Sequence, residues 1–109
     1  MIRLTADLWV SGYLARLRVI GIPAFVVARG DSTAGAVLVK LNTLDGQAVC
    51  YQRSFDLMSG DRRWVVLTEG PEPEVDASVA RQRGFDPDLW VIEVEDRAGR
   101  HLLDQPGLE

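Results

Sequence analysis

The side chains most able to do chemistry gather near the C-terminal end of the sequence, and most of them are carboxylates. The acidic members are Asp86, Asp88, Glu93, Glu95, Asp96 and Asp104. Converging carboxylates could hold a divalent cation or form an acid and base pair, but hard cations need several oxygens at one point. Two carboxylates spaced two residues apart on a strand stand about 7 Å from each other and supply only part of such a set. We therefore expect a solvated strand face, with Asp86 or Asp88 bonding nearby backbone in a turn, and neither a metal ion nor a cofactor.

His101 is the only histidine, and it directly follows Arg100. A histidine that acts as a general base needs a carboxylate to orient it and a nucleophile within hydrogen-bond reach. The serines, Ser54, Ser59 and Ser78, stand in no recognisable nucleophile context. The sequence thus favours a surface histidine on a terminal hairpin and predicts no catalytic residue.

Two further patterns could bind phosphate or nucleic acid. Residues 30–35 combine two glycines with two hydroxyls, but no lysine follows the second glycine and the segment leads into an apolar strand. A phosphate-binding loop instead leads into a helix N-terminus, so we interpret these residues as a hairpin loop. Aromatic and arginine side chains that could stack on single-stranded RNA are Tyr51, Arg53, Arg62, Arg63 and Trp64.

Composition limits the classes of partner. With 109 residues, 47% of them apolar and 26% charged, the chain is expected to form one globular domain over residues 1–109. Its net charge of −4 disfavours nucleic acid. Cys50 is the only cysteine, which rules out an intramolecular disulfide, and we expect it to point inward as a small hydrophobe. No apolar run approaches membrane-spanning length, so we expect no membrane partner and a cytoplasmic location.

The clearest predicted element is a strand over residues 85–96. Pro87 biases Asp86 towards extended backbone, residues 89–92 are apolar, and Glu93 to Glu95 then alternate. This pattern is typical of a strand whose first half is buried on both faces and whose second half is buried on one face. We expect the rest of the fold to pack against it.

The N-terminal segment allows two interpretations. Residues 2–8 alternate apolar and polar side chains, which predicts a short strand followed by a helix ending at Gly21. The alternative is one helix over residues 5–20 with Thr5 as its N-cap. The apolar residues at helical spacing are Val10, Tyr13 or Leu14, Leu17 and Ile20.

The middle of the chain predicts a meander of strands. Residues 24–29 and 36–41 are apolar runs joined by a loop, which favours a hairpin, and residues 47–53 and 63–69 continue the series. A second helix follows, with Pro73 at its first position, Gly84 at its left-handed end and Phe85 folding back onto Val79. Residues 100–104 form a last strand or a loose tail, and we expect residues 105–109 to fray.

These elements predict an α+β fold: a single domain with a mainly antiparallel sheet of five to six strands and two helices packed on one face of it.

Three groups of residues also carry a resemblance. They are residues 9–14; Arg29-Gly30-Asp31 with residues 35–40; and residues 85–91 with Glu93, Glu95, Asp96, Arg100 and His101. Together they resemble a family of short alphaproteobacterial proteins of unknown function, family 1491 among the domains of unknown function, over nearly the whole chain. The resemblance implies no activity, cofactor or catalytic residue.

Our first functional hypothesis is a non-enzymatic protein-binding or adaptor module, with a homodimer as one form of it, acting through an exposed sheet edge or the Trp90 region. The alternative is a small-ligand or metal-dependent enzyme that uses the acidic cluster, and RNA binding is a weaker alternative. The residues of the expected binding surface are Asp86, Asp88, Trp90, Glu93, Glu95, Asp96, Arg100 and His101.

Overall fold

The computed structural model describes residues 4–109. Its elements in chain order are α1 (Ala6–Val19), β1 (Ala24–Ala28), β2 (Val37–Asn42), β3 (Gln47–Phe55), β4 (Arg62–Pro71), α2 (Glu72–Phe85) and β5 (Trp90–Glu95). The five strands form one sheet in the order β1-β5-β2-β3-β4. All neighbouring pairs are antiparallel except β2 and β5, which run parallel. The predicted α+β class, mainly antiparallel sheet and two helices are confirmed.

The expected hairpin between the first two strands is wrong, because β5 lies between them. β5 pairs antiparallel with β1, with Ala24 opposite Val94, and parallel with β2, with Val37 opposite Trp90. Every residue of β2 is buried, as is typical of a strand in the interior of a sheet covered on both faces. The strand at the end of the chain therefore becomes an inner strand, as its apolar start predicts.

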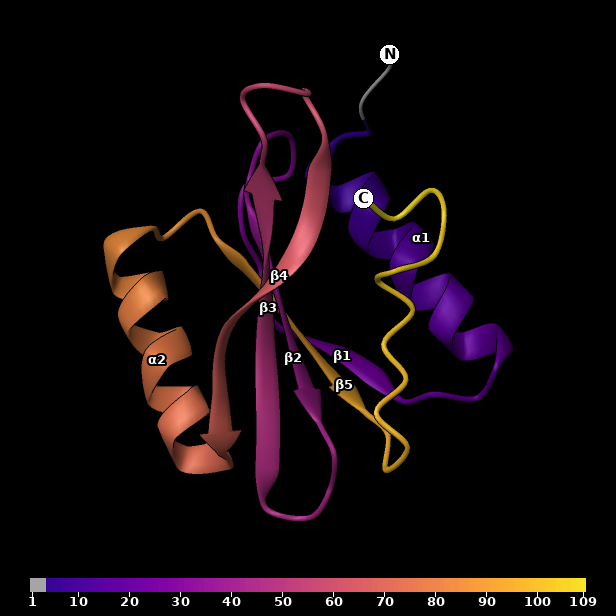
Figure 1. The fold of residues 1–109 in the computed structure, drawn as a ribbon, viewed down its shortest axis with the longest axis vertical. Helices are drawn as coiled ribbons and strands as arrows, with labels where there is room; N and C mark the ends of the chain where they lie inside the picture. Colours follow the sequence, from indigo (N-terminus) through magenta and orange to yellow (C-terminus); the bar gives the residue numbers. More distant parts are fainter. Residues whose placement is uncertain (1–3) are drawn as a thin grey trace.

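The two helices cover opposite faces of the sheet, which corrects the expectation that both would share one face (Figure 1). On the α1 side, Trp9, Tyr13 and Leu17 pack with Val39 and Ile92. The other core lies on the α2 side and contains Leu38, Ala48, Cys50, Val75 and Leu89. Period-two alternation along β2 sends its side chains to both cores in turn.

The N-terminal segment is helical, so the strand interpretation of residues 2–8 is wrong for residues 4–8, and residues 2–3 lie outside the described residues. Helix α1 begins after Thr5, as the alternative interpretation predicts. The Thr5 hydroxyl donates to Asp7 Oδ1 and does not cap the helix. Instead, the first backbone donors are bonded by a distant loop: Ala6 N to Thr33 O at 3.1 Å and Asp7 N to Ser32 O at 3.0 Å.

The second helix also departs from expectation at its ends. Pro73 takes the second helical position after Glu72, and α2 runs through Gly84 to Phe85. Phe85 does not fold back onto Val79, because its side chain is 84% exposed. Residues 86–89 are consequently a turn, and the predicted strand over residues 85–96 begins at Trp90.

The C-terminal tail, residues 96–109, forms no strand and crosses the face covered by α1 (Figure 1). Leu103 and Leu108 are buried in the core on this side. Arg16 Nη1 donates to Pro106 O at 3.0 Å, and Trp64 Nε1 donates to Leu108 O at 2.7 Å. Residues 105–109, which we expected to fray, are thus held between α1 and β4.

Candidate functional site

The acidic residues singled out in the sequence lie at separate places: in the turn before β5, on β5, just after its end and, for Asp104, in the C-terminal tail. At the start of β5, Asp86 Oδ1 accepts a hydrogen bond from Asp88 N at 3.1 Å, which is the expected turn contact. Beyond its end, Asp96 pairs with Arg100 through two side-chain contacts of 3.0 Å. That pairing holds the pKa of the Asp96 carboxyl below its usual value. Within residues 4–109, no three or more His, Cys, Asp or Glu side chains are placed to hold a metal ion.

Trp90 is a structural residue rather than part of an exposed surface. Its side chain is buried, and its Nε1 donates to Asp31 O at 2.8 Å. Asp31 N in turn donates to Asp88 O at 2.9 Å. The loop over residues 29–35 is therefore fastened to the start of β5, and Trp90, which we expected on the binding surface, lies inside the fold.

Two glycines make this close approach feasible. A Cβ added at Gly30 would stand 2.1 Å from Asp88 O and 2.6 Å from Trp90 Cδ1, and one at Gly35 would stand 2.5 Å from Asp88 O. Such distances are far inside van der Waals contact, so any side chain would push the loop away from β5. The two glycines thus serve backbone packing, not phosphate binding.

Arg83 ties the end of α2 to the same junction. Its Nε donates to Leu89 O at 2.9 Å, and its Nη2 donates to Arg29 O at 2.8 Å and Pro87 O at 3.1 Å. One guanidinium group therefore joins α2, the turn before β5 and the loop after β1. Arg29, Pro87 and Leu89 contribute their backbone oxygens to this junction.

A buried ion cluster around Lys40 was not predicted. Lys40 Nζ lies 2.7 Å from Glu72, 2.6 Å from Asp76 and 3.1 Å from Glu93, while its residue is only 5% exposed. The parallel register places Glu93 beside Lys40, and α2 brings the other two carboxylates over them. Asn42 Nδ2 also donates to Glu72 at 2.8 Å. The sequence feature that could have indicated this cluster is a single lysine, Lys40, within an apolar strand.

The charge of Lys40 is fixed by these neighbours. Burial by itself lowers the pKa of Lys40, but the hydrogen bonds to Asp76, Glu72 and Glu93 together outweigh it and hold the pKa above its usual value. The amine therefore stays protonated at neutral pH and is not available as a nucleophile or base. The cluster joins α2 to the sheet.

His101 also lacks the surroundings of a general base. Its Nδ1 accepts a hydrogen bond from Leu103 N at 2.9 Å, and its ring packs on Tyr51 with centroids 4.7 Å apart. Burial lowers the pKa of His101, against a weaker opposing effect of Asp104. The ring is thus neutral near pH 7. Its backbone oxygen accepts from the Tyr13 hydroxyl at 2.7 Å, which fastens the tail to α1.

Cys50 points inward, as predicted. The thiol is fully buried in the core under α2. Burial raises the pKa of Cys50 to about 11, partly offset by the positive charge of Lys40. The group is therefore a neutral thiol at physiological pH and not a reactive thiolate.

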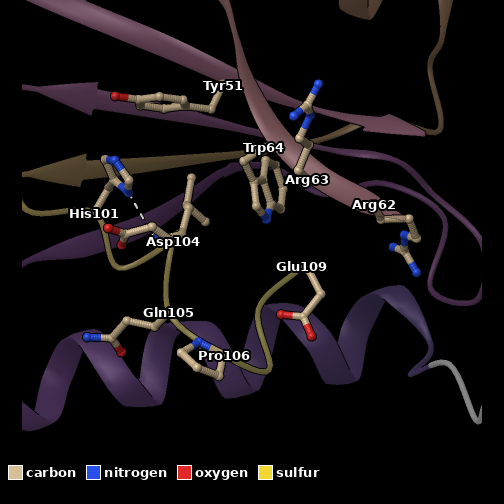
Figure 2. Close-up of a pocket in the computed structure, with 10 residues that line it drawn as sticks. Tyr51, Arg62, Arg63, Trp64, His101, Asp104, Gln105, Pro106 and Glu109 are labelled. Atoms are coloured by element: carbon tan, nitrogen blue, oxygen red, sulfur yellow. Dashed lines mark hydrogen bonds between the residues drawn. The ribbon is translucent and has the colours of Figure 1, made fainter. Parts of the chain in front are cut away.

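A cavity of about 420 Å³ lies between the C-terminal tail and the sheet; we call it the tail pocket. Tyr51, Trp64 and His101 form its aromatic part, and Arg62, Arg63, Asp104 and Glu109 carry its charges. Figure 2 shows the strands above, the tail in the middle and α1 below. The structure thus brings His101 together with four of the five residues that we considered as a stacking platform. No local pattern signals this pocket, because the tail and the strands are far apart in the sequence.

The fold and these contacts define a small α+β domain in which Trp90 and the loop over residues 29–35 hold the start of β5 in place. No helix among the described residues has the length and apolar character needed to cross a membrane. The chain belongs to the DUF1491 family of proteins of unknown function, whose sequence model matches residues 4–104. The resemblance stated from the sequence is confirmed. Among curated proteins, none matches this chain.

Solved structures of the family share the fold. The crystal structure of a DUF1491 family protein from Caulobacter crescentus is 39% identical, with a TM-score of 0.86, and the match covers 95% of this chain and 98% of that one. An NMR structure of a DUF1491 family protein from the same organism is 38% identical, with a TM-score of 0.83 and 97% of each chain covered. A solution structure of a protein from A. tumefaciens is 30% identical, with a TM-score of 0.78, covering 96% of this chain and 98% of that one.

Proposed function

We propose that this chain is a non-enzymatic protein-binding module of the cytoplasm and that its partner is a second copy, joined through the outer edge of β1. The observation that carries the proposal is the apolar, exposed character of this edge strand. Phe25, Val26 and Val27 are 48%, 41% and 59% exposed, although all three are large apolar residues in a strand. Exposed apolar edge strands are templates for pairing with another chain.

The opposite edge of the sheet supports this choice by contrast. Strand β4 carries Arg62, Arg63, Glu69 and Pro71, which are charges and a proline of the kind that protects an edge from pairing. Strand β1 has no charged residue between Ala24 and Ala28. The β1 edge is therefore uncharged and open to pairing with a second chain, whereas charges and a proline protect the β4 edge.

The backbone of β1 has free groups at its centre. Glu95 N donates to Pro23 O at 2.9 Å, so Pro23 and, by alternation, Phe25 direct their backbone groups towards β5. Ala24 and Val26 then direct theirs outward. A bulge after Val26 limits how far regular pairing can extend, so a dimer would depend on a short ladder together with side-chain contacts.

The residue sequence of β1 fits a second copy. Around Val26 it reads Ala-Phe-Val-Val-Ala. A two-fold axis at Val26 would place Ala24 opposite Ala28 of the other copy and Phe25 opposite Val27, so apolar side chains would meet throughout and no like charges would face each other. Val19 and Ile20 lie at the end of α1, shortly before β1 in the sequence, and add further exposed apolar surface, since they are 85% and 45% exposed.

The proposal is tested by the oligomeric state. Light scattering and sedimentation over a concentration series should give a dimer that dissociates on dilution, and Val26→Lys should make the chain monomeric because it places two lysines at the axis. The matched control is Val66→Lys, at a residue on the other edge strand that is 48% exposed, which should leave the dimer intact. A monomer at every concentration, or equal effects of the two variants, would refute the proposal.

A crosslink tests the geometry. In a Cys50→Ala background, Val26→Cys would place two thiols across the proposed axis, within the range that a disulfide needs. Rapid oxidation to a dimer is expected for this variant. In the same background, Val66→Cys should give no crosslinked dimer under the same conditions. A crosslink at Val66 but not at Val26 would show that two copies meet at β4 and would refute pairing through β1.

A further inference from the structure

The tail pocket has a rigid aromatic wall. Tyr51 and Trp64 lie on neighbouring strands of the same sheet face, since Tyr51 pairs with Val66 and Trp64 is two residues before it. Trp64 is held by its hydrogen bond to Leu108 O at 2.7 Å and by the Arg53 guanidinium 4.8 Å from its ring centre. A fixed aromatic surface inside a concave site is suited to the flat face of a planar ligand.

The charges around this wall are divided between its two sides. Arg62 and Arg63 are consecutive residues of β4, so only Arg62 shares the sheet face of Trp64, and Arg63 points away from the tail (Figure 2). Arg62 forms no ion pair in the described part of the chain. Guanidinium groups without a carboxylate partner are well suited to bind a phosphate or carboxylate. Asp104, from the tail, makes no hydrogen bond within residues 4–109 and can accept from amino or imino groups (Figure 2). A ligand that fits has a flat body, an anionic group and a donor edge.

A mononucleotide combines these three features. We propose that the tail pocket binds a mononucleotide whose base packs on Tyr51 and Trp64 and whose phosphate contacts Arg62. The volume of about 420 Å³ lies in the lower part of the range of small-molecule sites, about 300–1,000 Å³. A polynucleotide fits less well because the tail crosses the site, Asp104 and Glu109 add negative charge to it, and the chain as a whole carries −4.

The indole N–H signals of the three tryptophans give a direct test by NMR. AMP, GMP and UMP are titrated into the labelled protein, with adenosine and inorganic phosphate as partial ligands. At least one nucleotide should shift the Trp64 signal in a saturable way while leaving Trp90 unchanged, because Trp90 is buried at the loop junction. Adenosine and phosphate should each bind at least about tenfold more weakly than that nucleotide.

The charge variant Arg62→Gln should raise the dissociation constant at least about tenfold. The matched control, Arg81→Gln, removes the same charge from an exposed position on α2 and should have no such effect. Thermal melts establish that both variants fold. The proposal is overturned if no nucleotide shifts Trp64, if adenosine binds as tightly as AMP, if the two variants behave alike, or if a short single-stranded RNA binds while mononucleotides do not.

Discussion

Replacing Lys40 with methionine should cost much of the stability of the domain. Lys40 is 5% exposed and is the only cation within 4 Å of Glu72, Asp76 and Glu93 among the described residues. Methionine keeps most of the length and apolar contact of the side chain but removes the charge. Three carboxylates would then face one another between α2 and the sheet without compensation.

The magnitude follows from how well each carboxylate can reach water. Removing one partner of a fully buried ion pair costs about 3–5 kcal/mol. The side chain of Asp76 is 54% exposed and that of Glu72 is 32% exposed, so both can turn outward, whereas that of Glu93 is only 19% exposed. We therefore expect Lys40→Met to lower the free energy of unfolding by about 2–3 kcal/mol near pH 7.

The assay is urea unfolding followed by circular dichroism, with Arg81→Met as the control because Arg81 is an exposed arginine of α2. The control should change the free energy of unfolding by less than about 0.5 kcal/mol. A loss below about 1 kcal/mol would refute the ion-cluster interpretation.

Two further predictions concern the loop junction and the tail. Gly30→Ala should destabilise the domain by at least about 2 kcal/mol, since its Cβ would stand 2.1 Å from Asp88 O. Gly12→Ala, in an open helical position, should instead stabilise the domain by up to about 1 kcal/mol. Denaturant midpoints that move in the same direction for both variants would contradict this account. Because burial lowers the pKa of His101, the unfolded chain binds more protons as the pH falls below 6.5, so the free energy of unfolding should fall there. His101→Gln should reduce that fall in unfolding curves between about pH 7.5 and 5.5, and an unchanged pH dependence would show that His101 does not contribute.

Local patterns in the sequence predict most element boundaries but not how the elements are capped. Helix α1 was ambiguous because the alternation in residues 2–8 resembles a strand. What settles the ambiguity is non-local: Thr33 O and Ser32 O accept hydrogen bonds from Ala6 N and Asp7 N. A helix start whose first donors are bonded by another loop carries no capping signature of its own.

The order of the strands was the main error, and its cause is also non-local. A short loop between two apolar runs favours a hairpin, so β1 and β2 were expected to pair. The contrary signal was that β2 is apolar on nearly every residue, which is typical of a strand covered on both faces and often paired in parallel. The parallel neighbour, β5, lies about half the chain away, so only the side-chain pattern of both strands together could have suggested it.

The candidate sites illustrate the same limit. Asp86 in a turn could be predicted because aspartate next to proline has a strong local preference. The Lys40 cluster needed knowledge that β2 and β5 are parallel neighbours, and the tail pocket needed knowledge that the tail crosses β3 and β4. Sites formed by segments distant in sequence are visible only once the topology is known.

The two proposed surfaces can be tested independently because they lie far apart across the sheet. In the strand order β1-β5-β2-β3-β4, the proposed dimer edge is at one end, and the tail pocket is built on the last two strands at the other. Pairing through β1 would therefore leave the tail pocket of each copy at the end of the sheet farthest from the two-fold axis. Val26→Lys should then abolish dimerisation without changing nucleotide affinity, and Arg62→Gln should do the reverse. If one change altered both properties, the surfaces would be coupled through the intervening strands, whose side chains pack into shared cores.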